Sequence, residues 1–192
     1  PAPDSVAGGL VYEPKWDGFR CIVFRDGDEV VLGSRNEKPL TRYFPELVEA
    51  LRENLPPRCV VDGEIVVRTG GRLDFGNLQQ RIQPAVSRDT TPSTEIPASF
   101  VAFDLLALGD DDLKGRPFRE RRALLETALA DARPPVHLTR ISSDEAEGRS
   151  WFEVFDVPGH TAGHIAYLHR PEQAPGRPKI ASSPTGGRST QG

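Results

Sequence analysis

The residues that could carry covalent chemistry lie together in the stretch "YEPKWDGFRC", from Tyr12 to Cys21. Lys15 stands near its centre, and a lysine that acts as a nucleophile must lose a proton from an amine whose free pKa is about 10.4. Partial burial and nearby positive charge lower that pKa. Trp16 and Phe19 could give apolar cover, and Arg20 could give the charge. The stretch therefore indicates a candidate lysine nucleophile, and an exposed hairpin lysine is the alternative.

Strand patterns surround this lysine and recur along the chain. Asp26-Gly27 is a strong hairpin turn signal between two β-forming runs. We expect strands over 19–26, 29–34, 58–67, 99–108 and 136–140. Pro45 is suited to the first turn of a helix, and apolar residues at helical spacing support a second long helix later in the chain. We expect helices over 45–54, 75–82, 117–132 and from Ser142, capped with Glu145, to Phe155. The pattern predicts an α+β fold with antiparallel sheets.

Length and composition restrict the class of protein. The 192 residues suit one domain, or one domain with an attachment, and hydrophobic residues make up 37% of them. No apolar run approaches the roughly 18 residues of a membrane span, and no signal peptide is visible, so we expect a cytoplasmic protein. Cys21 and Cys59 lie in strand-like runs and are expected to be buried thiols. A net charge of −4 argues against a strongly basic nucleic-acid binder, although local arginines can still follow a phosphate backbone.

Four short motifs follow one another over about 95 residues. The first, Lys15 to Arg20, has the form Lys-x-Asp-Gly-x-Arg. The others are "GSRN" with Lys38 at 33–38, "VDGEIVV" at 61–67 and "FVAFDLLAL" at 100–108. In this order they resemble the covalent nucleotidyltransferase superfamily of ATP-dependent DNA ligases, RNA ligases and mRNA capping enzymes. The wording looks closest to bacterial DNA ligases of the repair and end-joining type, and the resemblance covers residues 10 to about 155.

The resemblance implies a fold and a reaction. The fold would be the ATP-grasp-like adenylation domain of the nucleotidyltransferases, with antiparallel sheets flanked by helices and the nucleotide between the sheets. Lys15 would attack the α-phosphate of ATP, release pyrophosphate and hold AMP as a phosphoramidate, with Mg²⁺ assisting. The AMP would then pass to the 5′-phosphate of nicked double-stranded DNA during repair and recombination. The resemblance further implies a monomer.

The same resemblance assigns the nucleotide contacts. Glu13 would lie beside the adenine edge, Arg20 would approach the ribose, and Phe103 would stack on adenine. Glu64 would bind a ribose hydroxyl or hold the metal, since Mg²⁺ takes few carboxylates and keeps several waters. The alternatives are a charge that needs a partner inside an apolar strand for Glu64 and core packing for Phe103. Asp104 is expected to fix a neighbouring loop rather than to take part in the chemistry.

Two arginines complete the implied site. Arg35 would contact the nucleotide and the 5′-phosphate of the nick, and Arg42 would join it in binding DNA. Arg35 could instead be an edge-strand arginine without such a role. Trp16 and Trp151 are expected to pack in the core rather than to stack on bases.

The family pattern stops near residue 156. We therefore expect a partial adenylation domain over 1–156, a divergent and disordered tail over 157–192, and no OB-fold domain. Such a chain should adenylate itself weakly at best and should not seal nicks efficiently. The tail contains "PGHTAGHIAYL", which resembles a histidine motif of metallo-β-lactamase-fold hydrolases, but His160 and His164 alone do not make the three-ligand site that catalytic zinc needs.

Three alternatives to a DNA ligase stay open from the sequence. The chain could be a non-catalytic nucleotide-binding remnant, an RNA ligase or capping-type enzyme, or a zinc hydrolase that uses the tail histidines. The missing upstream histidine cluster argues against the last of these.

Overall fold

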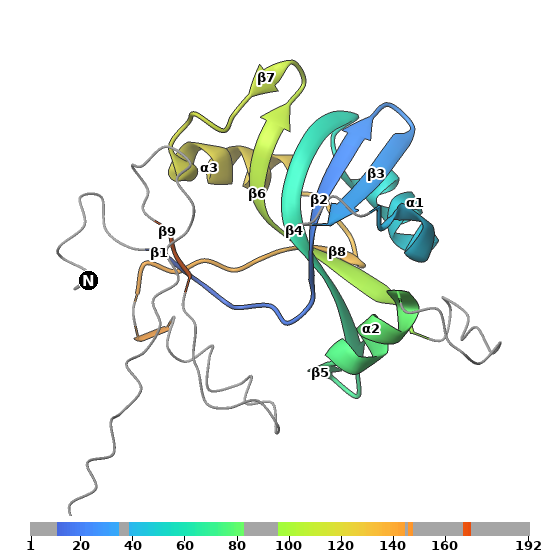
Figure 1. Cartoon of the computed structure of the whole chain (residues 1–192). Helices are drawn as coiled ribbons and strands as arrows, with labels where there is room; N and C mark the ends of the chain where they lie inside the picture. The colour runs from blue at the N-terminus through green and yellow to red at the C-terminus, as the bar shows by residue number, and fades with distance from the viewer. Residues whose placement is uncertain (1–10, 35–38, 83–95, 145, 148–166, 170–192) are drawn as a thin grey trace, which may run out of the picture. The chain divides into compact units, whose positions relative to one another are not determined.

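The computed structural model describes residues 11–34, 39–82, 96–144, 146–147 and 167–169 (Figure 1). The chain divides into two compact units. The described part of the first unit consists of 11–15, 140–144, 146–147 and 167–169, and that of the second of 16–34, 39–82 and 96–139. Lys15 thus belongs to the first unit, and the other motifs that the structure describes belong to the second.

The first unit contains a two-stranded antiparallel ladder. Strand β1 (Val11–Glu13) pairs with β9 (Tyr167–His169), and an isolated bridge joins Tyr12 to Ser142 through hydrogen bonds of 2.8 and 3.0 Å between their backbone groups. The sequence predicts no regular structure at 167–169. The strand there is compatible with the residue types, because tyrosine is common in strands.

The helix start expected at Ser142 uses a different cap. The Oδ1 atom of Asp144 accepts a hydrogen bond of 2.7 Å from the backbone amide of Ala146. The Ser142 hydroxyl accepts a 3.0 Å hydrogen bond from the Asp144 amide and lies 2.6 Å from a carboxylate oxygen of Glu147. Asp144 therefore caps this turn, and Glu145 lies outside the described residues. An aspartate competes well for exposed helical amides, because its carboxylate is short and charged.

The second unit is built on a seven-stranded sheet. Its main path runs β3-β2-β4-β6-β7, with β5 paired to β4 and β8 paired to β6. Only the β6–β8 pairing is parallel among the described strands. The strands are β2 (Phe19–Asp26), β3 (Glu29–Ser34), β4 (Arg58–Thr69), β5 (Arg72–Leu73), β6 (Ala98–Leu108), β7 (Asp111–Asp112) and β8 (Val136–Leu138).

Helices cover one face of this sheet. The described helices of the second unit are η2 (Thr41–Tyr43), α1 (Pro45–Asn54), α2 (Phe75–Ile82) and α3 (Phe118–Ala128). Leu47 and Leu51 of α1, Leu78 of α2 and Leu125 of α3 are all fully buried and join one core with inward residues of the strands. Helices α1, α2 and α3 each place their apolar residues on the sheet, as an amphipathic pattern requires. In the described part of the chain, no helix is both long and apolar enough to cross a bilayer.

The two faces of the sheet differ because successive strand residues alternate. Along β4, Cys59, Val61 and Ile65 enter the core, whereas Asp62 and Glu64 point to the other face. Both cysteines are free and buried, as the sequence predicts. The predicted α+β fold with antiparallel pairing is confirmed, and Asp62 and Glu64 lie on the face of β4 opposite to its core residues.

Candidate active site

The candidate nucleophile lies on the link between β1 and β2. Lys15 is exposed there, in a stretch without regular secondary structure. The partial burial that the sequence predicts for it is not seen. Phe19 packs edge-on against Phe75 instead, with ring centroids 5.3 Å apart, and the Trp16 indole N–H donates a 2.9 Å hydrogen bond to the Thr139 hydroxyl. Trp16 is half-buried rather than a core residue.

The next part of this link is pressed against β4. A Cβ atom on Gly18 would lie 2.2 Å from the carbonyl oxygen of Ile65 and 2.9 Å from the Glu64 side chain, so only glycine fits. The Gly18 amide also donates a hydrogen bond to the Glu64 carboxylate. The Lys-x-Asp-Gly motif and the "VDGE" motif therefore meet in space at Gly18 and Glu64, although 45 residues separate them in the sequence.

Glu64 is a carboxylate in an unusual environment. It lies directly across from Arg20 in the β2–β4 ladder. Burial raises the pKa of the Glu64 carboxyl to about 7, the Arg20 guanidinium opposes that rise, and Asp62 adds to it. When burial makes a carboxyl costly to ionise, a nearby cation or hydrogen-bond donor stabilises its ionised form.

Arg20 is held by Asp62, a residue outside the site predicted from the sequence. Its Nε donates to Oδ1 at 3.0 Å and its Nη2 to Oδ2 at 2.5 Å, and the guanidinium carbon lies 5.8 Å from the centre of the Phe103 ring. The sequence contains a signal for Asp62 as a site residue, because Asp62 and Glu64 are two positions apart in a strand and therefore lie on the same face of it. The structure thus brings together Arg20, Asp62, Glu64 and Phe103.

Asp104 also forms an ion pair. It is the ladder partner of Asp62, and two opposed carboxylates on neighbouring strands repel each other unless cations compensate them. Arg121 of α3 supplies that charge, with Nε to Oδ1 at 2.9 Å and Nη2 to Oδ2 at 2.7 Å. The contact ties Asp104 to helix α3, whereas the sequence predicts that Asp104 fixes a neighbouring loop.

The remaining predicted residues lie apart from this group. Glu13 is buried in β1 of the first unit. Arg42 lies in η2, where its guanidinium sits 4.5 Å from the centre of the Tyr43 ring. Arg35 and Trp151 lie outside the described residues. The convergence of Lys15 with Glu64 and Phe103 stays a prediction.

The described residues contain no group of three or more His, Cys, Asp or Glu side chains arranged to hold a metal ion. Mg²⁺ does not require such a group, because it is usually held by one or two carboxylates together with waters and substrate phosphates. Asp62 already forms an ion pair with Arg20. Glu64 offers hard carboxylate oxygens, and its burial means that a nearby cation would stabilise its charge. Glu64 therefore fits as a single Mg²⁺ ligand.

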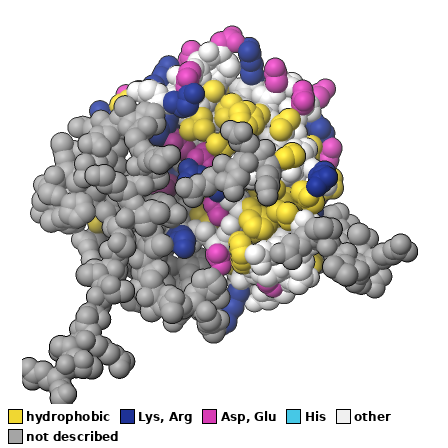
Figure 2. Space-filling view, in the orientation of Figure 1, with side chains coloured by type: hydrophobic (Ala, Val, Ile, Leu, Met, Phe, Trp, Pro, Cys, Tyr) yellow, Lys and Arg dark blue, Asp and Glu magenta, His cyan; other side chains and the backbone are white. Residues whose placement is uncertain are grey.

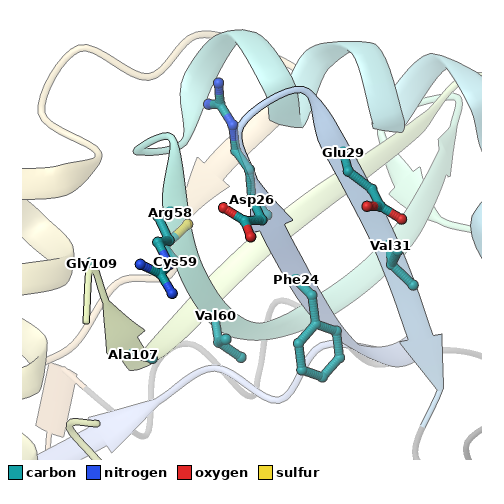
Figure 3. Close-up of a pocket in the computed structure, with 10 residues that line it drawn as sticks. Phe24, Asp26, Glu29, Val31, Arg58, Cys59, Val60, Ala107 and Gly109 are labelled. Carbon is teal, nitrogen blue, oxygen red and sulfur yellow. The ribbon is translucent and has the colours of Figure 1, made fainter. Parts of the chain in front are cut away.

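A pocket of about 370 Å³ lies toward the hairpin end of β2 and β3 (Figure 3). Phe24, Val31, Val60 and Ala107 form its apolar part, and Figure 2 shows apolar side chains gathered on this side of the molecule. Cys59 also lines it, but burial raises the pKa of that thiol to about 11, despite the opposing charge of Arg25, so the thiolate is scarce at neutral pH. The pocket holds none of the predicted site residues.

Comparison with known proteins gives one consistent result. Residues 4–156 match the model of the ATP dependent DNA ligase domain. The chain is 58% identical to DNA ligase C2 of Mycolicibacterium smegmatis over 156 residues, which cover 81% of this chain and 44% of that protein. It is 60% identical to DNA ligase C of Mycobacterium tuberculosis over 152 residues, which cover 77% of this chain and 42% of that protein. The chain thus spans less than half the length of these two relatives.

The solved structures agree with the sequence matches. A mycobacterial DNA ligase D, solved in complex with ATP and MES, superimposes with a TM-score of 0.60 and 32% identity. The match covers 77% of this chain and 46% of that one. The sequence and the fold of this chain are therefore similar to those of proteins named as DNA ligases.

Proposed function

Because the chain belongs to the family of ATP-dependent DNA ligase domains, we propose that it carries the self-adenylation step, with Lys15 as the nucleophile. The observation that supports this most directly is the contact between Gly18 and Glu64, which joins the lysine motif to the acidic motif. A turn that carries a reactive lysine must be held still, because misplacement by about 1 Å can cost roughly 10²-fold in rate.

The proposed reaction is an in-line transfer of AMP to the lysine. The Nζ lone pair of Lys15 forms a bond to the α-phosphorus of ATP, and the bond from that phosphorus to the bridging oxygen of the β-phosphate breaks. Pyrophosphate leaves with the electron pair, and Nζ gives its proton to solvent. The reaction makes few covalent demands on the protein, so positioning and charge dominate. In the later steps, a 5′-phosphate oxygen of DNA displaces Lys15 from AMP, and a 3′-hydroxyl then displaces AMP.

The nucleotide contacts are proposed for residues of strands β1, β2, β4 and β6. Phe103 would stack on adenine, Glu64 would accept a hydrogen bond from a ribose hydroxyl or hold the metal, and Arg20 would lie close to the sugar. Glu13 would contact the adenine edge. The Arg20 guanidinium carbon lies 5.8 Å from the centre of the Phe103 ring. This distance supports the proposal that the motifs at 15–20 and 100–108 form one site.

Mg²⁺ and DNA are the further proposed components. Mg²⁺ bound to Glu64 would neutralise charge on the phosphates, while the protein side chains bind and orient the nucleotide. Nicked duplex DNA would contact Arg35 and Arg42, and its affinity should depend strongly on salt because the contacts are to phosphates. We further propose that the protein acts as a monomer in the cytoplasm, in DNA repair and recombination.

Labelling with ATP that carries a radioactive α-phosphate tests the proposal. The chain should take up label in the presence of Mg²⁺, and a phosphoramidate should release it in acid but keep it in alkali. Lys15→Ala and Lys15→Arg should take none. Lys114→Ala is the matched control, because Lys114 is an exposed lysine that follows β7 in the sequence and forms an ion pair with Asp112. Label that persists in the Lys15 variants contradicts the nucleophile, and a preference for GTP would favour a capping-type enzyme.

A further inference from the structure

We propose that Trp16 is a positioning residue for Lys15, and that it acts through the hydrogen bond from its indole to Thr139. The inference rests on the proposed function, because it assumes that Lys15 is the nucleophile. It assigns a task to a side chain that the chemistry itself does not use.

The acceptor of this hydrogen bond is firmly held. Thr139 is 1% exposed. Its amide donates to the carbonyl oxygen of Ala102 at 2.9 Å, and its own carbonyl oxygen accepts from Nη2 of Arg122 at 2.8 Å. Arg122 is itself only 5% exposed. The Thr139 hydroxyl is therefore a fixed point next to β6, and the 2.9 Å bond from Trp16 restricts the indole ring.

The donor is bonded directly to the residue that it would position. Trp16 follows Lys15 in the chain, in a link without regular secondary structure. The link is fastened at Trp16 by the indole and at Gly18 by the contact with β4. An indole suits this task because it is rigid, has two side-chain torsions and carries one N–H donor at a defined place. Restricting Trp16 limits the positions open to the Lys15 backbone.

The hydrogen bond also joins two residues that lie at the unit boundaries in the sequence. The first compact unit ends at Lys15 and resumes at Arg140, so Trp16 and Thr139 are the residues at which the chain enters and leaves the main part of the second unit. The hydrogen bond therefore joins the two ends of the segment 16–139. A bulky apolar residue would fill the same space, but it would not fix this distance.

Four variants test the inference. Trp16→Phe keeps an aromatic ring without the N–H, and Thr139→Val keeps the shape of the threonine without the hydroxyl. In each we expect the rate of enzyme–AMP formation at saturating ATP to fall roughly 10- to 100-fold, while the Kd for ATP changes less than about 3-fold. The double variant should be no slower than the slower single variant, because both remove one contact. Thr139→Ser should restore the rate, because it restores the acceptor.

Thr127→Val is the matched control. Thr127 is an exposed threonine of α3 whose hydroxyl donates a 2.9 Å hydrogen bond to the carbonyl oxygen of Ala123, so it loses a similar contact away from the link. Its rate should equal that of the parent chain. If Thr139→Val lowers the melting temperature but leaves the saturated rate unchanged, the bond is structural and the inference is wrong. A loss that appears only in the Kd for ATP also overturns it.

The remaining outcomes are equally decisive. If Trp16→Phe does not fold, the comparison of Thr139→Val with Thr139→Ser still decides the question, and equal rates for those two refute the positioning role. Label on the parent chain together with unaffected variants removes this inference but keeps the proposed function. A parent chain that takes no label overturns both.

Discussion

Arg20 and Asp62 form an ion pair with two contacts across the adjacent strands β2 and β4. The Asp62 side chain is 8% exposed, whereas that of Arg20 is 45% exposed. The carboxylate is therefore the fixed member of the pair, and it determines where the guanidinium lies. The ring of Phe103, the residue proposed to stack on adenine, lies 5.8 Å from the Arg20 guanidinium carbon.

This arrangement predicts that Asp62→Asn weakens nucleotide binding. The amide keeps one acceptor but loses the charge and the second contact, and hydrogen bonds to charged groups are worth about 1.5–3 kcal/mol. We expect the Kd for ATP to rise about 10-fold, measured by calorimetry in a Lys15→Ala background that cannot turn over. Asp110→Asn is the control, because Asp110 pairs with Arg58 at the surface. An unchanged Kd in a folded Asp62→Asn variant contradicts the prediction.

The Asp104–Arg121 pair predicts a different effect, on stability. Its side chains are 13% and 9% exposed, and breaking a buried pair by removing one partner typically costs about 3–5 kcal/mol. Arg121→Ala should lower the free energy of unfolding by roughly that amount. Arg58→Ala breaks a pair whose members are both well exposed, so it should cost no more than about 1 kcal/mol. Urea unfolding of both variants checks this, and equal losses would show that Arg121 does not anchor α3.

Much of the fold of the second unit follows from local pattern. The Asp26-Gly27 turn, the alternation along β2 and the apolar runs of β4 and β6 predict strands that the structure contains. The short strands β5 and β7 have two residues each and no periodicity to detect. The strand at 167–169 depends on a partner far away in the sequence, which no local pattern contains.

The candidate residues follow from the sequence and their roles stay predictions, whereas the pairings between them do not follow from the sequence. The motif order places Lys15, Arg20, Glu64 and Phe103 as candidates. That Arg20 turns to Asp62, two residues before Glu64, depends on the β2–β4 register. The hydrogen bond from Trp16 to Thr139 spans 123 residues and is likewise a consequence of tertiary structure.

Gly18 and Gly76 predict opposite results for the same substitution. Gly18→Ala would put a Cβ atom 2.2 Å from the Ile65 carbonyl oxygen, so the link must move away from β4 and self-adenylation should fall at least 10²-fold. At Gly76, in α2, the nearest atom would be 3.5 Å away, and alanine in a helix is favoured over glycine by about 0.5–1 kcal/mol. Gly76→Ala should raise the melting temperature and keep the label. Normal labelling of Gly18→Ala would show that the close approach is not needed.

Glu64 predicts a specific dependence of stability on pH. Burial raises the pKa of its carboxyl from 4.5 to about 7, although Arg20 opposes the rise. Between those two values the folded protein keeps a proton that the unfolded chain has released. The free energy of unfolding therefore falls as pH rises through this range, and the contribution of Glu64 levels off above it.

Glu64→Gln should remove this contribution. Glutamine resembles the protonated acid, and its carbonyl oxygen can still accept from the Gly18 amide. The variant should therefore gain stability relative to the parent chain between pH 5 and pH 8, by on the order of 2–3 kcal/mol. Urea unfolding at both pH values measures the difference. His137, whose pKa is lowered by burial and by Arg68, titrates in both proteins and cancels. Parallel stability curves, or a gain by the parent chain at high pH, would show that Glu64 ionises without cost, and would weaken the case for a cation at this carboxylate.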